Sequence, residues 1–378
     1  MLSADIDIRI VDTIAAIPAG QWDALTGDNP FLCHAFLLAL QESGCATLST
    51  GWQAQFITAS RDGLLLGAMP LYLKTHSYGE YVFDWAWAEA YERHGLDYYP
   101  KLLGAVPFTP VTGLRILTSL PEIRTALIDS ALQLAQQSGV SSLHCLFPDE
   151  TQALVLQQAG MMLRKGVQFH WQNHDYADFD AYLACMNNDK RKKIKQERRR
   201  VRDAGISFDW IIGDQISAAQ WSFFVDCYHH TYRQHRSTPY LNLDFFRQIG
   251  ATMGKHILLV LAFRDGQPIA SALNIFTRDT LYGRYWGALE YHPGLHFETC
   301  YYQAIAFCIA NKIAVFEGGA QGEHKLARGF LPVITWSAHW LAHAGFGQAV
   351  EDFLARESSG ITRYADELNE RNPFKHQD

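Results

Sequence analysis

"LLVLAFRDGQPIASALNIFTRDTLYGRYWGA", residues 258–288, decides the fold of this chain, because it repeats the plan of residues 57–86, "ITASRDGLLLGAMPLYLKTHSYGEYVFDWA". In both stretches an Arg-Asp-Gly turn separates two apolar runs, and a Tyr-Gly-x-Tyr segment follows. The copies are 203 residues apart at the Arg-Asp-Gly turns and 204 apart at the Tyr-Gly-x-Tyr segments. Ordered matches at a nearly constant separation indicate an internal duplication.

The repeated plan predicts the same elements in each half. An Asp-Gly pair between apolar runs is typical of a β-hairpin, because Gly accepts the positive φ of such turns. We expect a third strand after each hairpin, then a helix, then a buried strand. The predicted ranges are 81–87, 122–137 and 142–147 in the first half and 281–287, 298–311 and 313–317 in the second. This order predicts an α+β fold with tandem duplicated domains.

The length of 378 residues also favours two domains, because single hydrophobic cores stop growing at about 250–300 residues. A composition of 48% hydrophobic and 19% charged residues is typical of an ordered globular protein. We place the boundary near Asn173, between a strand-like segment and a helical one. The predicted domains are residues 1–173 and 174–378.

Targeting signals and cysteine usage bear on the compartment. The first residues, "MLSADIDIRIVDTI", carry three aspartates where a secretory signal needs a cationic start and an apolar core. Apolar runs such as residues 257–263 are far shorter than the ~20 residues of a membrane span. Seven cysteines without a C-x-x-C pair disfavour a disulfide framework and a zinc ribbon. We therefore expect a cytoplasmic protein.

Three long stretches carry a family resemblance: "SYGEYVFDWAWAEAYERHGLDYYPKLL" (77–103), "RYWGALEYHPGLHFETCYYQAI" (284–305) and "FEGGAQGEHKLARGF" (316–330). They resemble the FemAB-like bacterial family, associated with peptidoglycan biosynthesis or recognition. The order of elements resembles the GNAT superfamily of N-acyltransferases, and the tandem arrangement resembles the Fem-type aminoacyl transferases that build peptidoglycan cross-bridges. The resemblance implies two GNAT-like domains, each with a mainly antiparallel sheet and flanking helices.

A strongly basic segment stands out in a chain with a formal net charge of −7. "DKRKKIKQERRRVRD", residues 189–203, holds nine basic residues, has no Gly or Pro, and predicts a helix. A solvated surface helix is the plain interpretation. However, charges of one sign at i and i+4 repel each other, which favours a bound anion. The candidate phosphate-binding residues here are Lys190, Lys193, Arg198 and Arg202.

A glycine-rich segment follows the last buried strand of the second half. We expect Glu317 at the end of that strand, followed by Glu323, His324, Lys325 and Arg328. Acyl transfer to an amine needs a group that accepts the amine proton, and Glu317, Glu323 and His324 are the candidates. Lys325 and Arg328 are candidates for holding a phosphate or carboxylate. A tight turn with solvated charges is the alternative.

The donor is expected to be a phosphate-bearing co-substrate, either acyl-CoA or aminoacyl-tRNA. GNAT proteins bind the coenzyme A pyrophosphate with a glycine-rich loop, but the matching place, residues 290–300, contains only Gly294. Fem-type enzymes depart from the GNAT pattern in a similar way, which favours aminoacyl-tRNA. The resemblance implies a small amine or a muropeptide as acceptor.

Aromatic residues supply further candidates. Phe83, Trp85 and Trp87 alternate with smaller residues and predict a strand with one bulky face, which is usually core. A cleft that stacks on a sugar or peptide is the alternative. The candidate substrate-binding residues are Trp85, Glu92, Arg93 and His94 in the first half and Tyr282 and Tyr285 in the second.

The remaining chemistries have weak support. His339 and His343 are four residues apart, but their apolar surroundings and the lack of a His-Glu-x-x-His pattern disfavour a metal site. No Gly-x-Ser-x-Gly motif indicates a serine nucleophile. The leading hypothesis is an N-acyltransferase or aminoacyltransferase whose second half is the active one. The alternative is a scaffold that binds peptidoglycan precursors or RNA without catalysis.

Overall fold

The computed structural model describes residues 6–319 and 322–375. Ala320 and Gln321, which belong to the predicted glycine-rich segment, lie outside the described residues. The chain forms two compact units. The first comprises Met1–Val167 and Ile334–Arg363, and the second comprises Gln168–Val333 and Tyr364–Asp378. Each unit is therefore built from two segments of the chain, whereas the predicted ranges, 1–173 and 174–378, are continuous.

The first unit contains a small antiparallel sheet and a larger mixed one. The small sheet has the order β1-β3-β4, and the larger has the order β2-β5-β6-β7-β14. The pair β6–β7 is parallel, and β14 runs antiparallel to β7, which is why its segment groups with this unit. The strands are β1 (Asp7–Val11), β2 (Trp52–Ala54), β3 (Phe56–Arg61), β4 (Leu64–Met69), β5 (Leu71–Lys74), β6 (Lys101–Gly104), β7 (Ser142–Leu146) and β14 (Leu331–Leu341).

Helices of the first unit cover its sheets. The longest wholly within it is α4, whose buried residues Ile123, Leu127 and Ala131 join the core beneath β3, β6 and β7. The spacing of these residues by four places them on one face of the helix. The helices are α1 (Ala19–Thr26), α2 (His34–Glu42), α3 (Trp85–Arg93), α4 (Pro121–Gln137), α5 (Glu150–Gln158) and the first part of α12 (Ala344–Glu370), with short turns η1 (Ile14–Ala16) and η2 (Leu48–Thr50).

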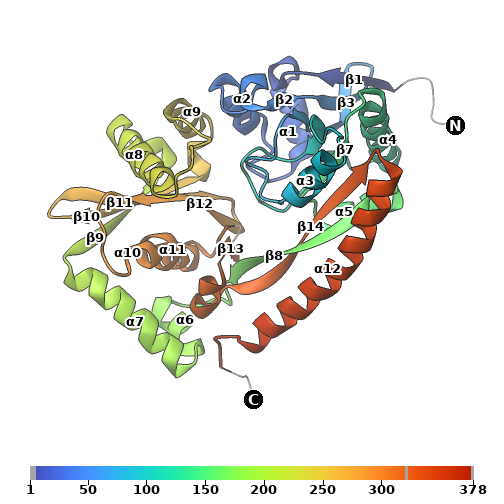
Figure 1. Ribbon diagram of the computed structural model, residues 1–378. Helices are drawn as coiled ribbons and strands as arrows, with labels where there is room; N and C mark the ends of the chain where they lie inside the picture. The colour runs from blue at the N-terminus through green and yellow to red at the C-terminus, as the bar shows by residue number, and fades with distance from the viewer. Residues whose placement is uncertain (1–5, 320–321, 376–378) are drawn as a thin grey trace. The chain divides into compact units, whose positions relative to one another are not determined.

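The second unit is built on one mixed sheet with the order β8-β13-β12-β11-β10-β9. Only the pair β12–β13 is parallel. Figure 1 shows α8 and α9 on one face of this sheet and α10 and α11 on the other. The strands are β8 (Met162–Gln172, of which the residues from Gln168 on belong to this unit), β9 (Ile206–Ile212), β10 (Ile257–Arg264), β11 (Gln267–Phe276), β12 (Thr280–Ala288) and β13 (Val315–Glu317).

The helices of the second unit include the predicted basic one. This helix, α7 (Asn188–Asp203), is capped by Asn187, whose side chain accepts a hydrogen bond from the backbone N–H of Lys190. The others are α6 (Phe179–Cys185), α8 (Ala218–Gln234), α9 (Leu243–Met253), α10 (Leu295–Phe297), the π-helical η5 (Glu298–Tyr302) and α11 (Gln303–Asn311), with short turns η3 (Gly213–Gln215), η4 (Gly254–His256) and η6 (Glu323–Arg328). In the described part of the chain, no helix is both long and apolar enough to cross a membrane.

Both predicted hairpins are confirmed, with matching turns. The two turn residues have φ values of 51° and 77° at Asp62 and Gly63, and of 51° and 75° at Asp265 and Gly266. Positive φ at both central residues belongs to a type I′ turn, whose twist suits an antiparallel pair. The strand expected after the second hairpin is also confirmed, as β12.

The strand predicted at residues 81–87 is wrong. Tyr81 adopts a left-handed conformation with φ of 63°, and helix α3 begins at Trp85. The helix turns Trp87 and Tyr91, four residues apart, into the core, whereas Phe83 and Trp85 are exposed. The alternating aromatics therefore do not share one face, because the chain turns into a helix after Asp84.

Candidate functional site

The strands β12 and β13 separate after a short parallel pairing. The pairing ends at Tyr282 and Glu317, although β12 continues to Ala288. Arg284 is an extra residue between the pairs that β12 makes with β11, and such a bulge bends a strand. A pocket of about 270 Å³ lies where the strands separate. Among its lining residues are Gly283, Tyr285, His296, Cys300, Tyr301, Gly318, Gly319 and Lys325; we call it the reaction pocket.

Lys325 is the principal cation of the reaction pocket. Its side chain is 2% exposed, and its Nζ donates a hydrogen bond to the carbonyl oxygen of Gly319 at 2.9 Å. Burial lowers its pKa to about 8, so it carries most of its charge at neutral pH. The neighbouring Cys300 has a pKa raised by burial and remains a thiol. Because Lys325 forms no ion pair with a described acidic residue, its ammonium is available to bind an anionic group of a ligand.

Glu317 lies at the end of β13, one residue before the pocket-lining Gly318. Burial raises its pKa to about 8, although the positive charge of Arg284 acts in the opposite direction. Its Oε2 has no hydrogen-bond partner among the described residues and lies 4.0 Å from Nε2 of His170. Burial lowers the pKa of His170 to about 4, so this ring is neutral. A carboxylate in these surroundings accepts a proton near pH 8.

The other two candidate bases have different surroundings. Glu323 accepts a hydrogen bond from the hydroxyl of Tyr364 at 2.7 Å and pairs with Arg371 at 3.3 Å. The hydrogen bond from Tyr364 lowers the pKa of this exposed carboxyl most, and the positive charge of Arg371 lowers it further. The His324 ring hydrogen-bonds the hydroxyl of Tyr301, which lines the reaction pocket, and burial lowers its pKa. Of the three candidates, only Glu317 has a raised pKa.

Arg328 is engaged in a buried ion pair with the basic helix. Its Nη2 donates to both carboxylate oxygens of Glu197, at 2.9 and 3.0 Å, and its guanidinium lies 3.4 Å from the ring centre of Phe297. Glu197 is the single acid between Lys190 and Arg202 and also accepts a hydrogen bond from Tyr302. The acid in the basic run therefore faces inward and anchors α7 to η5 and η6.

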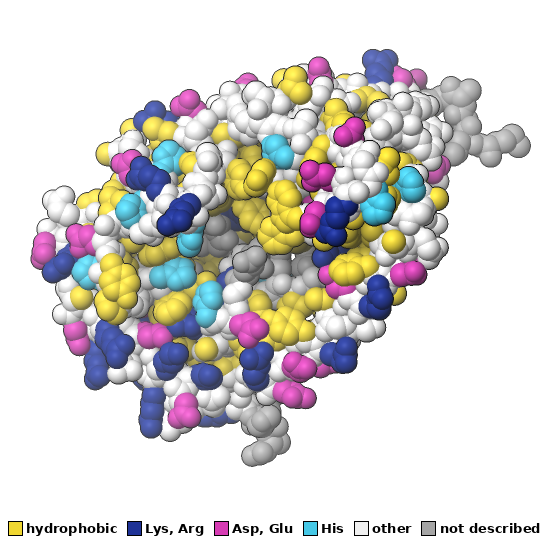
Figure 2. All heavy atoms as spheres, in the orientation of Figure 1, with side chains coloured by type: hydrophobic (Ala, Val, Ile, Leu, Met, Phe, Trp, Pro, Cys, Tyr) yellow, Lys and Arg dark blue, Asp and Glu magenta, His cyan; other side chains and the backbone are white. Residues whose placement is uncertain are grey.

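The candidate cations of α7 fall into two groups. Arg198 pairs with the buried Glu298 at 3.1 Å and lines, with Arg202, a second pocket between α6, α7, β9 and η5. Lys190 and Lys193 do not line that pocket. Figure 2 shows lysine and arginine side chains gathered along α7.

Tyr282 and Tyr285 lie on β12 on either side of the bulge. Tyr282 is the register partner of Glu317, and burial raises its pKa. Tyr285 lines the reaction pocket and packs edge-on against Tyr228 of α8, with 5.2 Å between ring centres. Tyr285 and Lys325 thus line the reaction pocket, whereas Tyr282 and Glu317 face each other at the end of the β12–β13 pairing and are not among its lining residues.

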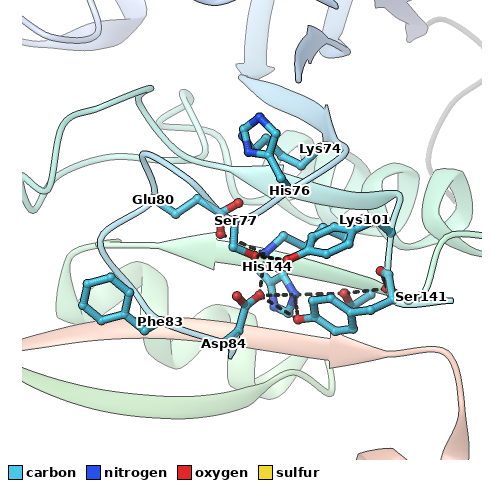
Figure 3. A network of polar contacts seen from close by, with 12 residues as sticks. Lys74, His76, Ser77, Glu80, Phe83, Asp84, Lys101, Ser141 and His144 are labelled. Atoms are coloured by element: carbon cyan, nitrogen blue, oxygen red, sulfur yellow. Dashed lines mark hydrogen bonds and ion pairs between the residues drawn. The ribbon is translucent and has the colours of Figure 1, made fainter. Parts of the chain in front are cut away.

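The first unit contains a buried polar network (Figure 3). Lys101, which is fully buried, donates to Ser77 at 2.7 Å, to Glu80 at 2.8 Å and to Asp84. The hydroxyl of Tyr98 donates to Asp84 at 2.7 Å and contacts Nε2 of His144. Burial alone would lower the pKa of Lys101, but the two carboxylates raise it. The network fixes the loop that leads into α3.

The first-unit candidates lie on α3, outside this network. Trp85 is 41% exposed and its ring lies 5.2 Å from that of Tyr78. Glu92 and Arg93 are exposed, and Arg93 pairs with Glu89 at 2.7 Å. The His94 ring hydrogen-bonds the carbonyl oxygen of Ala90 at 2.8 Å. Trp85 is therefore available to a ligand, while Arg93 and His94 are engaged with their own helix.

Sequence reasoning missed several residues of both sites. His170 has no motif around it, and it reaches Glu317 only because β8 pairs with β13. Lys101 and Glu80 stand 21 residues apart and look like ordinary surface charges in the sequence. The single signal for Glu197 was its isolation among cations, which marks a charge that can be paired inward.

Two domains, each with a β-hairpin, a parallel strand pair and flanking helices, define a tandem GNAT-like fold. The crystal structure of FemX is similar, with a TM-score of 0.54 and 12% identity over 89% of this chain and 98% of that one. So is the C-terminal domain of a putative lysylphosphatidylglycerol synthetase from Agrobacterium fabrum, with a TM-score of 0.54 and 10% identity over 91% and 97% of the two chains.

A third similar structure is that of L-PGS from Bacillus licheniformis, with a TM-score of 0.51 and 10% identity over 86% of this chain and 97% of that one. Identities this low show a shared fold. No curated protein matches this chain in sequence. Residues 13–376 match the family described as FemAB-like, peptidoglycan biosynthesis/recognition. The chain belongs to the FemAB-like family.

Proposed function

We propose that this protein is an N-acyltransferase or aminoacyltransferase that works at the reaction pocket, with Glu317 as general base. The observation that carries the proposal is the placement of Glu317, whose pKa burial raises to about 8, at the point where β12 and β13 separate. A base with a pKa near the working pH combines a useful ionised fraction with a strong drive to accept a proton. Family membership supports the same class of reaction.

The reaction is direct attack of an amine on an activated ester. The neutral amine nitrogen forms a bond to the ester carbonyl carbon, and the carbonyl oxygen gains negative charge. Glu317 takes the proton that the nitrogen loses, the bond to the leaving oxygen or sulfur breaks, and the proton then passes to that leaving group. Lys325 holds the anionic part of the donor.

The donor is proposed to be an aminoacyl-tRNA or an acyl-CoA, and the acceptor an amine of a peptidoglycan precursor. The Lys325 ammonium, together with Lys190 and Lys193 of α7, supports a donor that carries phosphates. The family's association with peptidoglycan supports the acceptor. Tyr282 and Tyr285 are proposed acceptor contacts.

The test is product formation by the wild-type protein and a set of single variants, each offered both donors with a muropeptide amine. Mass spectrometry would detect the acylated acceptor. We expect Glu317→Gln to lower kcat by about 10²–10⁴-fold, the usual contribution of a general base, with unchanged thermal unfolding. Glu290→Gln, which alters an exposed carboxylate, is the matched control.

Two results would contradict this assignment. Full activity of Glu317→Gln together with loss of activity in Glu323→Gln or His324→Ala would move the base to η6. Full activity of all three variants would refute acyl transfer by these bases. Binding of muropeptide or RNA without turnover of either donor would instead identify a non-catalytic scaffold.

A further inference from the structure

The pocket beside α7, here called the α7 pocket, is separate from the reaction pocket. It has a volume of about 660 Å³ and shares no lining residue with the reaction pocket. That volume lies in the range of about 300–1,000 Å³ in which small-molecule sites fall. The function proposed above makes no use of this space, and nothing in it is needed for proton transfer at Glu317.

The α7 pocket combines an apolar floor with a cationic wall. Its apolar lining residues come from three elements: Phe179 and Leu183 of α6, Val201 of α7, and Ile206 and Phe208 of β9. Its cations all come from one flank of α7: Lys192, Lys195, Arg198, Arg199 and Arg202. Five cations against the carboxylates of Asp180 and Glu298 leave a formal charge of +3.

Two of the five cations form ion pairs with acidic residues that also line the pocket. Arg198 pairs with Glu298, which is 3% exposed, and its guanidinium lies 4.1 Å from the ring centre of Phe179. Lys195 pairs with Asp180 at 3.3 Å. The other three, Lys192, Arg199 and Arg202, make no ion pair with any described residue. These three side chains are therefore available to an anion.

We propose that the α7 pocket binds an anionic phospholipid. Its phosphate lies against Lys192, Arg199 and Arg202, and an acyl chain lies on the floor formed by Leu183, Ile206 and Phe208. A phosphate without an acyl chain would contact the cations and leave the apolar floor of the pocket uncovered. A nucleic-acid strand would need a basic track longer than one helix flank, and the chain as a whole carries a formal charge of −7. A single amphiphile fits both surfaces.

The experiment measures binding of dihexanoyl phosphatidylglycerol as a monomer by isothermal titration calorimetry at fixed ionic strength. Glycerol phosphate supplies the head without chains, and dihexanoyl phosphatidylcholine supplies the chains with a zwitterionic head. We expect the anionic lipid to bind at least tenfold more tightly than either, which corresponds to about 1.4 kcal/mol. The readout does not involve turnover, so it is independent of the function proposed above.

Two neighbouring arginines give a matched pair of variants. Arg199 lines the pocket and Arg200 does not, and both are exposed on the same helix. We expect Arg199→Glu to weaken binding of the anionic lipid at least tenfold. Arg200→Glu should change the Kd by no more than about twofold, because salt screens the interaction of the lipid with a solvent-exposed charge outside the pocket. Phe208→Ala should weaken the lipid but not glycerol phosphate.

The proposal has clear contrary outcomes. Equal effects of Arg199→Glu and Arg200→Glu would show attraction by overall charge and not a pocket. Glycerol phosphate binding as tightly as the lipid would show a phosphate site without a chain. A single-stranded oligonucleotide that displaces the lipid at lower concentration than the lipid's own Kd would assign the surface to nucleic acid.

Discussion

Lys101 and Glu80 of the first unit and Lys325 and Glu317 of the second are all shielded from solvent, but in opposite ways. In the first unit, Lys101 contacts two carboxylates, and its pKa is raised. In the second unit, the one hydrogen bond that Lys325 donates to a described residue goes to a backbone carbonyl, and Glu317 has no charged cation within ion-pair distance among the described residues; both have a pKa of about 8. Charges that neutralise one another hold a loop in place, whereas charges left without a partner beside a pocket are free for chemistry.

This contrast favours the second unit as the catalytic one. The network of the first unit lines none of the pockets described above, and Glu80, whose pKa burial raises to about 7, stays bonded to Lys101. In the second unit, Lys325 lines a pocket of about 270 Å³, and Glu317 directly precedes Gly318, which also lines it.

The largest effect is expected from Lys101→Met. This variant leaves two buried carboxylates without a counter-charge, and breaking a buried pair costs about 3–5 kcal/mol. Urea unfolding followed by circular dichroism measures the loss. Adding Glu80→Gln and Asp84→Asn should recover part of it, because no charge then remains buried without a partner. A loss below about 1 kcal/mol for Lys101→Met would show that the network is not structural.

The next effect is the pH dependence of kcat/KM. Glu317 must be ionised to accept a proton, so the rate should rise about tenfold per pH unit between roughly pH 6 and 8. Lys325 must be protonated to hold the donor, so the rate should fall above its pKa of about 8. Glu317→Gln should remove the rising limb. A rate independent of pH between 6 and 8 in the wild-type protein would contradict the role of Glu317.

A smaller effect is expected for Lys325→Met, which removes a charge-assisted hydrogen bond worth about 1.5–3 kcal/mol. We expect KM for the donor to rise about tenfold or more with a smaller change in kcat. Steady-state kinetics at saturating acceptor separate the two constants. Lys255→Met removes an exposed lysine of the same unit and serves as the control. A loss confined to kcat would assign Lys325 to the transition state.

The smallest effect is expected for Arg93→Ala. Arg93 and Glu89 form an exposed pair on α3, 66% and 63% exposed, and such pairs contribute about 0.3–0.5 kcal/mol. Thermal unfolding should therefore change little beside that of Lys101→Met. A large destabilisation would mean that the surface of α3 is as tightly coupled as the network beneath it.

Much of the fold could be predicted from sequence because it depends on local signals. The Asp-Gly turns, the absence of Gly and Pro in residues 189–203, and the position of Glu317 after an apolar run each act over a few residues. The strand predicted at residues 81–87 failed because alternation of aromatics does not reveal that Asp84 is held by Lys101, after which the chain turns into α3.

The sequence by itself determined the duplication, the two hairpins, the basic helix and the set of ionisable residues near Glu317. Only the tertiary structure decided which of these groups are neutralised and which stay unpaired. Glu197 and Arg328, 131 residues apart, cancel each other, while Glu317 is left beside a neutral histidine from another strand. The reason is physical: a pKa depends on burial and on charges within a few ångströms, and strands and helices distant in sequence supply both.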